Sequence, residues 1–390
     1  MRVDSERITI HCGHHVLSFN RHGMVEPKED GYYYNQTRFI SRFGLTSEGK
    51  PLKSVACIPV EPHATVAYLL LPSPAGGKAE PPGEPNDEGG GAFVQKGIEI
   101  QINTYVGGGC HQDVHVTNHA LAEATFALDF EFDADFADIQ EVSEGERKQK
   151  ARVHRSFSSD APGRGELTFA YEHPKLNHKT RVRIAALGQL TDEGHSLRAI
   201  LSLGRQETQA ITIDVAPVFL GESIEPWFGP DGDLVGNKEV FALRREWLVN
   251  CVECETSNPH VQAAWARAAT DLWSLQSLTG KGEENFTPIA GIPKYTGLFG
   301  RDSLVVGIQS SLLNVSTLFG ALLSLGEWMA DGRRSLRCPA RQSAASAPAQ
   351  SVSDPRKDAF HPLLRRLLGP CLLSDRRGLA FRDDRRPAGL

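Results

Sequence analysis

With 390 residues, 40% of them hydrophobic, the chain has enough material for two domains or one large one with a real core. Its formal net charge is −6 and its basic residues form no stripe before the C-terminal region, which excludes nucleic acid as a partner of the body of the protein. Polar residues interrupt the longest apolar stretch, 304–325, so we expect no membrane-spanning segment and no membrane partner.

The N-terminus lacks the basic and then apolar stretch of a secretory signal. The chain also holds seven cysteines, an odd number without the spacing of a disulfide framework. Free thiols are typical of a reducing compartment, so we expect a cytoplasmic protein.

From Arg7 to about Phe219 the sequence consists mostly of short β-like runs bounded by Gly, Pro, Asn and Asp. Apolar and polar residues alternate at Ile98-Ile100-Ile102 and at Ile211-Ile213-Val215, the pattern of half-buried antiparallel strands. Many short strands without intervening helices predict an antiparallel β-sandwich. Residues 73–91 (SPAGGKAEPPGEPNDEGGG) form a Pro/Gly/acidic stretch that we interpret as a disordered insertion.

The periodicity changes near Arg244. Residues 258–278 carry an apolar helical face, and Ser257-Asn258 supplies the N-terminal cap. A loop rich in Gly and Pro follows over 279–299, and then a second helix from about Asp302 to Met329 that can divide near Asn314.

The most informative stretch is GLFGRDSL, residues 297–304, which places an Arg-Asp pair at the start of this second helix. By local pattern alone, the carboxylate of Asp302 is most simply a cap for exposed backbone N–H groups. Arg301 is then held beside the helix start, where it can donate hydrogen bonds to hydroxyl or carboxylate oxygens.

Four segments, taken in chain order, resemble bacterial glycogen-debranching, amylo-α-1,6-glucosidase-like proteins. Two match the signatures of that family's N-terminal domain, and two match the opening of its catalytic domain: GYYYNQTRFISRF (Gly31–Phe43), FDADFADIQEV (Phe132–Val142), WARAATDLWSL (Trp265–Leu275) and IAGIPKYTGLFGRDSL (Ile289–Leu304) with the helix VVGIQSSLL after it. The resemblance covers roughly residues 1–332.

The resemblance implies a β-sandwich domain over residues 1–245, followed over 255–332 by the first helices of an (α/α)6 toroid, which is incomplete in this chain. It further implies an α-glucan substrate such as glycogen, acid/base hydrolysis of α-glucosidic linkages, and no cofactor. Arg301 and Asp302 are then expected to bind sugar hydroxyls, with Tyr295 as a stacking platform. The family usually shows Pro-Trp where this chain has Lys294-Tyr295, and Arg-Asp where it has Asn35-Gln36.

After Gly332 the composition changes to Arg, Pro, Ser, Ala and Leu, and residues 333–390 have no sustained period. One account is a natural unstructured tail. The other, which we favour, is a frameshift: one codon choice for 359–377, read one nucleotide later, spells HSTPYFGGSSDPACFLIAE, which resembles a later segment of the family.

The family's catalytic carboxylates are expected beyond Gly332, and no residue of this chain is assigned to them. Glycoside hydrolysis needs two carboxyl groups, so whether the chain is an enzyme stays open. The alternative is an inactive truncated fragment that acts at most as a glucan-binding β-sandwich.

The other candidates for chemistry favour structural interpretations. The acidic run 133–141 lacks the spacing of a calcium loop, and we expect strand-end carboxylates there. The spacing of His111, His115 and His119 suits a metal on a helix, whereas their context is strand-like, so we expect no metal. The group His11, Cys12, His14 and His15 is expected on the surface, Arg38 is expected to be structural, and Gly107–Gly109 is expected to be a hairpin turn.

Overall fold

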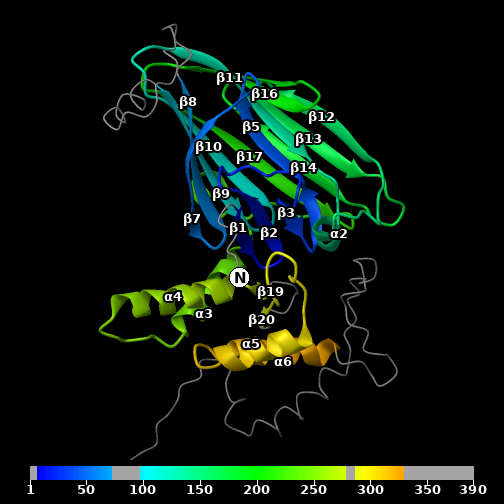
Figure 1. Cartoon of the computed structure of the whole chain (residues 1–390), viewed down its shortest axis with the longest axis vertical. Helices are drawn as coiled ribbons and strands as arrows, with labels where there is room; N and C mark the ends of the chain where they lie inside the picture. Colours follow the sequence, from blue (N-terminus) through cyan, green and yellow to red (C-terminus); the bar gives the residue numbers. More distant parts are fainter. Residues whose placement is uncertain (1–6, 73–96, 278–285, 329–390) are drawn as a thin grey trace, which may run out of the picture. The chain divides into compact units, whose positions relative to one another are not determined.

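The computed structural model of the chain describes residues 7–72, 97–277 and 286–328 (Figure 1). The predicted insertion 73–91 and the predicted tail 333–390 lie outside the described residues. The chain divides into two compact units, 1–325 and 326–390, and the described elements belong to the first, apart from residues 326–328. The boundaries predicted at 245 and 255 stay predictions.

The largest sheet of the described part has nine antiparallel strands. Eight follow one another in the order β12 (Val153–Ala161), β13 (Arg164–Tyr171), β14 (Lys179–Ala185), β17 (Thr208–Phe219), β10 (Cys110–Asn118), β9 (Gly97–Val106), β8 (Ala64–Pro72) and β7 (Lys53–Glu61), and β18 (Glu222–Ser223) pairs with β17.

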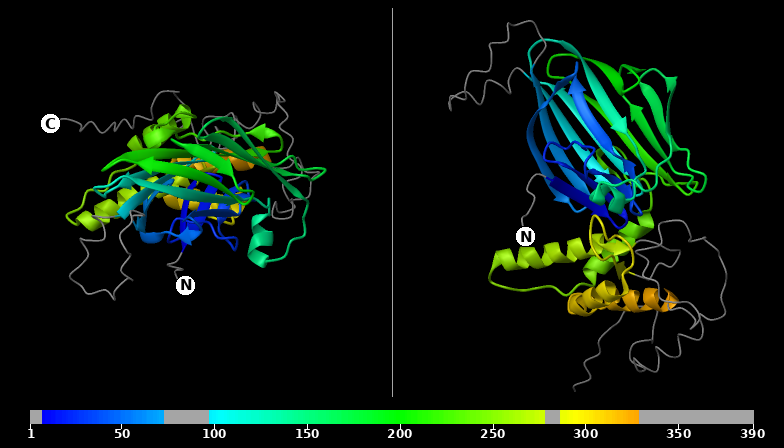
Figure 2. Two further views of the ribbon diagram at one scale, coloured as in Figure 1. Left: turned by 90° about the horizontal axis from the view of Figure 1, so that it is seen from above. Right: turned by 45° about the vertical axis from the view of Figure 1, so that its right-hand side comes forward.

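A second layer faces this sheet and consists of two smaller antiparallel sheets (Figures 1 and 2). One has the order β15 (Gln189–Asp192), β16 (Ser196–Leu203), β11 (Ala124–Asp133), β5 (Arg42–Ser47) and β6 (Lys50–Pro51). The other has the order β1 (Arg7–Cys12), β2 (His15–Asn20), β3 (Gly31–Tyr34) and β4 (Thr37–Ile40).

The core lies between the two layers, and the alternation of the sequence explains which residues fill it. In the strand register Ile102 of β9 lies opposite Val114 of β10, which lies opposite Ile211 of β17, and all three side chains are buried. Phe130 of β11 and Leu197 of β16 belong to the same cluster from the second layer. The antiparallel β-sandwich predicted from the sequence is therefore confirmed.

Five helices are described, and two of them, α3 and α4, pack on a second apolar cluster. The bounds of the five are α2 (Ile139–Glu144), α3 (Lys238–Val249), α4 (Pro259–Ser274), α5 (Gly300–Ser310) and α6 (Ser316–Trp328), with a short 3₁₀ turn η1 (Pro230–Gly232). Trp247 of α3 and Trp273 of α4 form this cluster, with ring centroids 5.9 Å apart. In the described part of the chain, no helix is both long and apolar enough to cross a membrane.

The two predicted helices are present, with different ends. Asn258 caps α4 as expected, because its side chain accepts a hydrogen bond from His260 N. The helix ends at Ser274 instead of 278, since Leu275 is its C-cap and the two residues after that pair as β19 (Gln276–Ser277) with β20 (Thr287–Pro288). The second helix divides at Asn314, whose side chain accepts a hydrogen bond from Ser316 N at the start of α6.

Candidate functional site

The two N-terminal signature segments, far apart in sequence, are joined by one buried arginine. Arg38 lies on β4, only 6% exposed, and donates to both carboxylate oxygens of Asp135 at 3.0 and 2.5 Å. Its remaining donors reach the carbonyl oxygens of Lys28 and Asp30 at 2.9 and 3.2 Å. The predicted structural role of Arg38 is confirmed by this geometry.

The acidic run between 133 and 141 is engaged in local bonds, as the structural interpretation predicts. Asp135 also accepts from Arg147 at 3.0 Å. Asp138 and Glu141 form a capping box around the first turn of α2, a helix that periodicity did not predict because it has six residues. An Asp followed three positions later by Glu is the sequence signal that could have revealed it.

The loop before α5 lies against this part of the sandwich. Ile292 packs with buried Tyr33 and Ile139, and the Lys294 ammonium donates to the hydroxyl of Ser143, which lies in α2. The loop closes on itself through two backbone hydrogen bonds between residues 291 and 295, of 3.0 and 2.9 Å.

The tip of the β3–β4 hairpin reaches the same loop. Asn35 and Gln36 both have positive φ, 45° and 65°, as a tight two-residue hairpin connection requires. The amide nitrogen of Gln36 is close enough that a Cβ on Gly297 would lie 3.3 Å from it. Three of the four recognised segments, 31–43, 132–142 and 289–304, therefore meet at one junction. Nothing in the spacing of these segments along the chain predicts that meeting.

The three predicted binding residues are all accessible to solvent. Tyr295 is 54% exposed and packs edge-to-face on Phe299, with ring centroids 5.8 Å apart. The side chains of Arg301 and Asp302 are 88% and 39% exposed and form a loose ion pair of 3.7 Å. The structure thus pairs Arg301 with Asp302 at the start of α5 and places Tyr295 six residues earlier on the loop.

Asp302 does not cap the helix. Because α5 begins at Gly300, after Phe299 in the N-cap position, Asp302 is the third residue of the first turn. Within the described residues its carboxylate contacts only the Arg301 guanidinium. The side chain is 39% exposed, so the carboxylate can accept further hydrogen bonds from hydroxyl donors.

The expected surface location of the histidines near the β1–β2 turn is wrong, because residues that follow in the helical region cover His11 and His14, and His15 packs against tyrosine rings. His11 and His15 are buried and His14 is half-buried. Ser274 and Ser277 cover the turn: Ser274 O lies 3.2 Å from His11 Nδ1, and Ser277 Oγ lies 2.8 Å from His14 Nε2. Burial lowers the pKa of both histidines to about 4. These contacts join residues 263 positions apart, which explains why sequence reasoning missed them.

The predicted hairpin turn at Gly107–Gly109 is confirmed, between β9 and β10. His111 and His115 lie on β10, and His119 follows the end of that strand, so no helix aligns them. His111 lies between Asp113 and Asp214, at 3.1 and 2.7 Å. Burial opposes its protonation, but the hydrogen bonds to these carboxylates raise the pKa of His111 to about 9.

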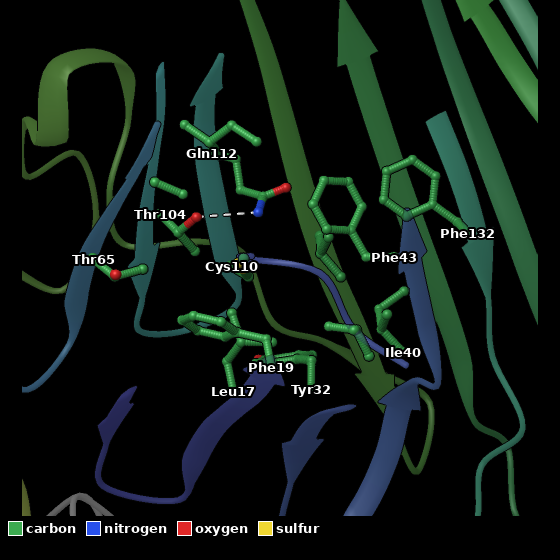
Figure 3. Close-up of a pocket in the computed structure, with 15 residues that line it drawn as sticks. Leu17, Phe19, Tyr32, Ile40, Phe43, Thr65, Thr104, Cys110, Gln112 and Phe132 are labelled. Atoms are coloured by element: carbon green, nitrogen blue, oxygen red, sulfur yellow. Dashed lines mark hydrogen bonds between the residues drawn. The ribbon is translucent and has the colours of Figure 1, made fainter. Parts of the chain in front are cut away.

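The cavity between the layers is too small for a sugar. Figure 3 shows Gln112 and Thr104 of the large sheet facing Phe19, Phe43 and Tyr32 of the second layer across it. Its volume is about 20 Å³, whereas small-molecule sites occupy roughly 300–1,000 Å³. A second cavity, beside His11 and His63, measures about 10 Å³. Neither is a site for glucan.

The chain was compared with known proteins. A family described as the N-terminal domain of some glycogen debranching enzymes matches residues 10–214. No curated protein matches the chain. Among solved structures, a protein named as a kojibiose phosphorylase, from the human microbiome, is similar to the chain with 9% identity and a TM-score of 0.44, over 74% of this chain and 41% of that protein.

A galactose mutarotase-like protein from Clostridium acetobutylicum has 6% identity and a TM-score of 0.29, over 55% of this chain and 95% of its own. A galactose mutarotase-related enzyme from Lactobacillus acidophilus has 8% identity and a TM-score of 0.27, over 53% and 96%. The matched part of this chain spans less than half of the microbiome protein, 41% of its length.

Proposed function

Because the chain belongs to the family of N-terminal domains found in some glycogen debranching enzymes, we propose that it binds α-glucan through Tyr295, Arg301 and Asp302. The ring of Tyr295 offers an exposed apolar face to a glucose ring. Arg301 supplies donors and Asp302 supplies acceptors for sugar hydroxyls. A stacking ring beside donors and acceptors for hydroxyl groups suits an α-glucan partner such as glycogen or a linear oligosaccharide.

The observation that carries the proposal is the junction of the hairpin tip, α2 and the loop 289–299. The Lys294–Ser143 bond and the packing of Ile292 hold that loop on the sandwich. The loop in turn leads directly into α5, whose first turn bears Arg301 and Asp302. A preorganised loop loses little conformational freedom when a ligand binds, which favours a binding role at this position.

Two forms of the proposal differ in chemistry. In the first, the chain takes part in amylo-α-1,6-glucosidase-type hydrolysis, which needs one carboxyl group as acid and a second as base or nucleophile. In the second, it is a glucan-binding module without hydrolysis. Between residues 286 and 326 Asp302 is the only acidic residue, so the loop and α5 supply a single carboxyl group, which favours the second form.

The cytoplasm is the proposed location. The five cysteines in the described ranges are free, which supports a reducing compartment.

The test is calorimetric titration of the full chain with maltoheptaose and with glycogen. We expect Tyr295→Ala and Asp302→Asn each to weaken binding at least tenfold. The matched control is Arg267→Ala on α4, which removes a comparably exposed Arg–Asp pair of 2.7 Å away from the junction. Unchanged affinity in Tyr295→Ala and Asp302→Asn, or an equal loss in Arg267→Ala, would contradict the proposal.

The same samples separate the two forms of the proposal. Release of reducing sugar from glycogen or pullulan above a blank, abolished by Asp302→Asn, would support hydrolysis. Binding without release would support the binding module.

A further inference from the structure

Strand β10 presents a row of polar side chains on the outward face of the nine-stranded sheet. Val114 and Val116 are fully buried in the core between the layers. Because side chains alternate along a strand, Asp113 and His115 must therefore point to the opposite face. Asp113 is nevertheless almost completely buried, since a segment of chain covers this face.

That segment, residues 225–236, crosses the outward face on its way from β18 to α3. Trp227 lies against the glycine turn at Gly107 and Gly108, where a Cβ would meet its indole at 2.7 and 2.3 Å. Phe228 stacks over Tyr105 of β9 with ring centroids 5.5 Å apart. These two aromatic anchors fix where the next residues of the segment lie.

The anchored segment places Asp231 beside Asp113 and His115 of β10. The backbone N–H of Asp231 donates to Asp113 Oδ2 at 2.8 Å, and Asp231 Oδ1 lies 3.9 Å from His115 Nε2. One ligand atom from each of Asp113, His115 and Asp231 lies within 4.8 Å of the other two. In the described part of the chain, this is the only group of its kind.

The atoms and their spacing suit a divalent transition metal. Imidazole nitrogen and carboxylate oxygen are both zinc ligands, at about 2.0–2.2 Å. Two such bonds span up to about 4.2 Å, so the 3.9 Å separation of His115 and Asp231 can be bridged by one ion.

A buried partner orients one of these ligands from behind. His111 Nε2 lies 3.1 Å from Asp113 Oδ1, and His111 Nδ1 lies 2.7 Å from Asp214 Oδ1. Metal-binding carboxylates are commonly held by such outer hydrogen bonds, which fix the direction of the ligand atom. Each oxygen of Asp113 keeps a lone pair for a further partner.

We propose that Asp113, His115 and Asp231 bind a divalent transition-metal ion of the zinc class, with water completing the coordination. The ion fastens segment 225–236 to the outer face of the sheet. Because this segment leads from β18 into α3, the metal stabilises the path from the sandwich to the helices. This role is independent of glucan binding at Tyr295, Arg301 and Asp302.

The test is titration of the full, untagged and chelator-treated chain with Zn²⁺ by calorimetry. We expect one ion per chain, with an affinity at least tenfold weaker in His115→Ala and in Asp231→Asn. The side chain of Asp231 is 82% exposed, so its isosteric variant keeps the fold. The matched control is His119→Ala, which should leave zinc affinity unchanged because His119 lies 3.4 Å from Glu99 and outside the ligand group.

Co²⁺ as a second probe distinguishes this site from the cysteines. Visible d–d absorption without a thiolate charge-transfer band, lost in Asp231→Asn, supports the proposal. A thiolate band, or zinc affinity that is equal in the parent chain, His115→Ala and Asp231→Asn, overturns it. Absence of zinc binding by the parent chain also overturns it.

Discussion

Replacing Arg38 by methionine should lower the free energy of unfolding by about 3–5 kcal/mol, the usual loss when one partner of a buried ion pair is removed. Methionine keeps an unbranched apolar stem of similar length beside Gly31, where the Arg38 side chain lies close to the backbone. The change therefore removes the guanidinium and its hydrogen bonds while disturbing the packing little.

The size of the expected loss in stability follows from the hydrogen bonds that the Arg38 guanidinium donates. Arg38 makes four hydrogen bonds, two to Asp135 and one each to the carbonyl oxygens of Lys28 and Asp30. Each buried acceptor left without a donor costs about 1–3 kcal/mol. Asp135 keeps its bond from Arg147 and part of its exposure, which limits its share of the loss. The two carbonyls then contribute the larger part of the expected effect.

The assay is urea unfolding of the full chain, followed by circular dichroism of the strands. Arg42→Met is the matched control, because Arg42 lies four residues along, is half exposed and pairs with Glu131 at 2.6 Å. An exposed pair of this kind is worth about 0–1 kcal/mol. Arg38→Lys keeps the charge but loses the planar fork and should be intermediate. If Arg38→Met and Arg42→Met lower the free energy of unfolding equally, the buried Arg38 guanidinium does not hold the two signature segments together.

Two further predictions concern the glycine turn and a buried histidine. Gly108→Ala should lower the free energy of unfolding by about 2–4 kcal/mol, because φ is +66° and the new Cβ would lie 2.3 Å from Glu225 O. Gly49→Ala is the control: φ is +74° there but the Cβ would enter open space, so the loss should be about 1 kcal/mol. Comparable melting temperatures for the two variants would refute the steric argument. Burial, with a smaller contribution from the neighbouring His14 charge, lowers the pKa of His15 to about 3. As the pH falls from about 6.5 towards 3, His15 is therefore protonated in the unfolded chain before it is protonated in the folded one. Its contribution to the free energy of unfolding is full above about pH 6.5 and is lost between these two values, by up to ~1.4 kcal/mol per pH unit. His15→Gln should flatten the dependence of melting temperature on pH there, and an unchanged slope would show that the ring is already protonated in the fold.

Sequence patterns predicted the sandwich well where a strand has one buried face. The strand predicted from the alternation at Ile98, Ile100 and Ile102 is β9, Gly97–Val106, and all three side chains are buried in the core. The prediction for the second long helix was also sound, including its division at Asn314. There the polar side chain binds the start of α6 and also donates to Trp247 O at 3.1 Å.

Contacts between distant segments could not be predicted in the same way. The pairing of Arg38 with Asp135 spans 97 residues, and the cover over His11 spans 263. Local pattern describes a residue's own strand or helix, whereas burial at a strand end depends on whichever element lies over it. The β1–β2 turn was expected in solvent for this reason, and the ligand group on β10 was missed because Asp231 comes from another part of the chain.

The small four-stranded sheet contacts the helical region at two points. Its β1–β2 turn contacts the end of α4, where Gly13 N donates a hydrogen bond to Ser274 O at 3.0 Å. The loop before α5 contacts the β3–β4 hairpin and the neighbouring α2 through Ile292 and Lys294. Arg38 lies on β4 of the same sheet and binds Asp135, three residues before the N-cap of α2. Loss of that arginine should therefore loosen the loop that carries Tyr295 as well as the sandwich, so Arg38→Met should weaken glucan binding even under conditions where the chain stays folded. Gly108→Ala, which acts on the large sheet, should leave glucan affinity unchanged at equal loss of stability.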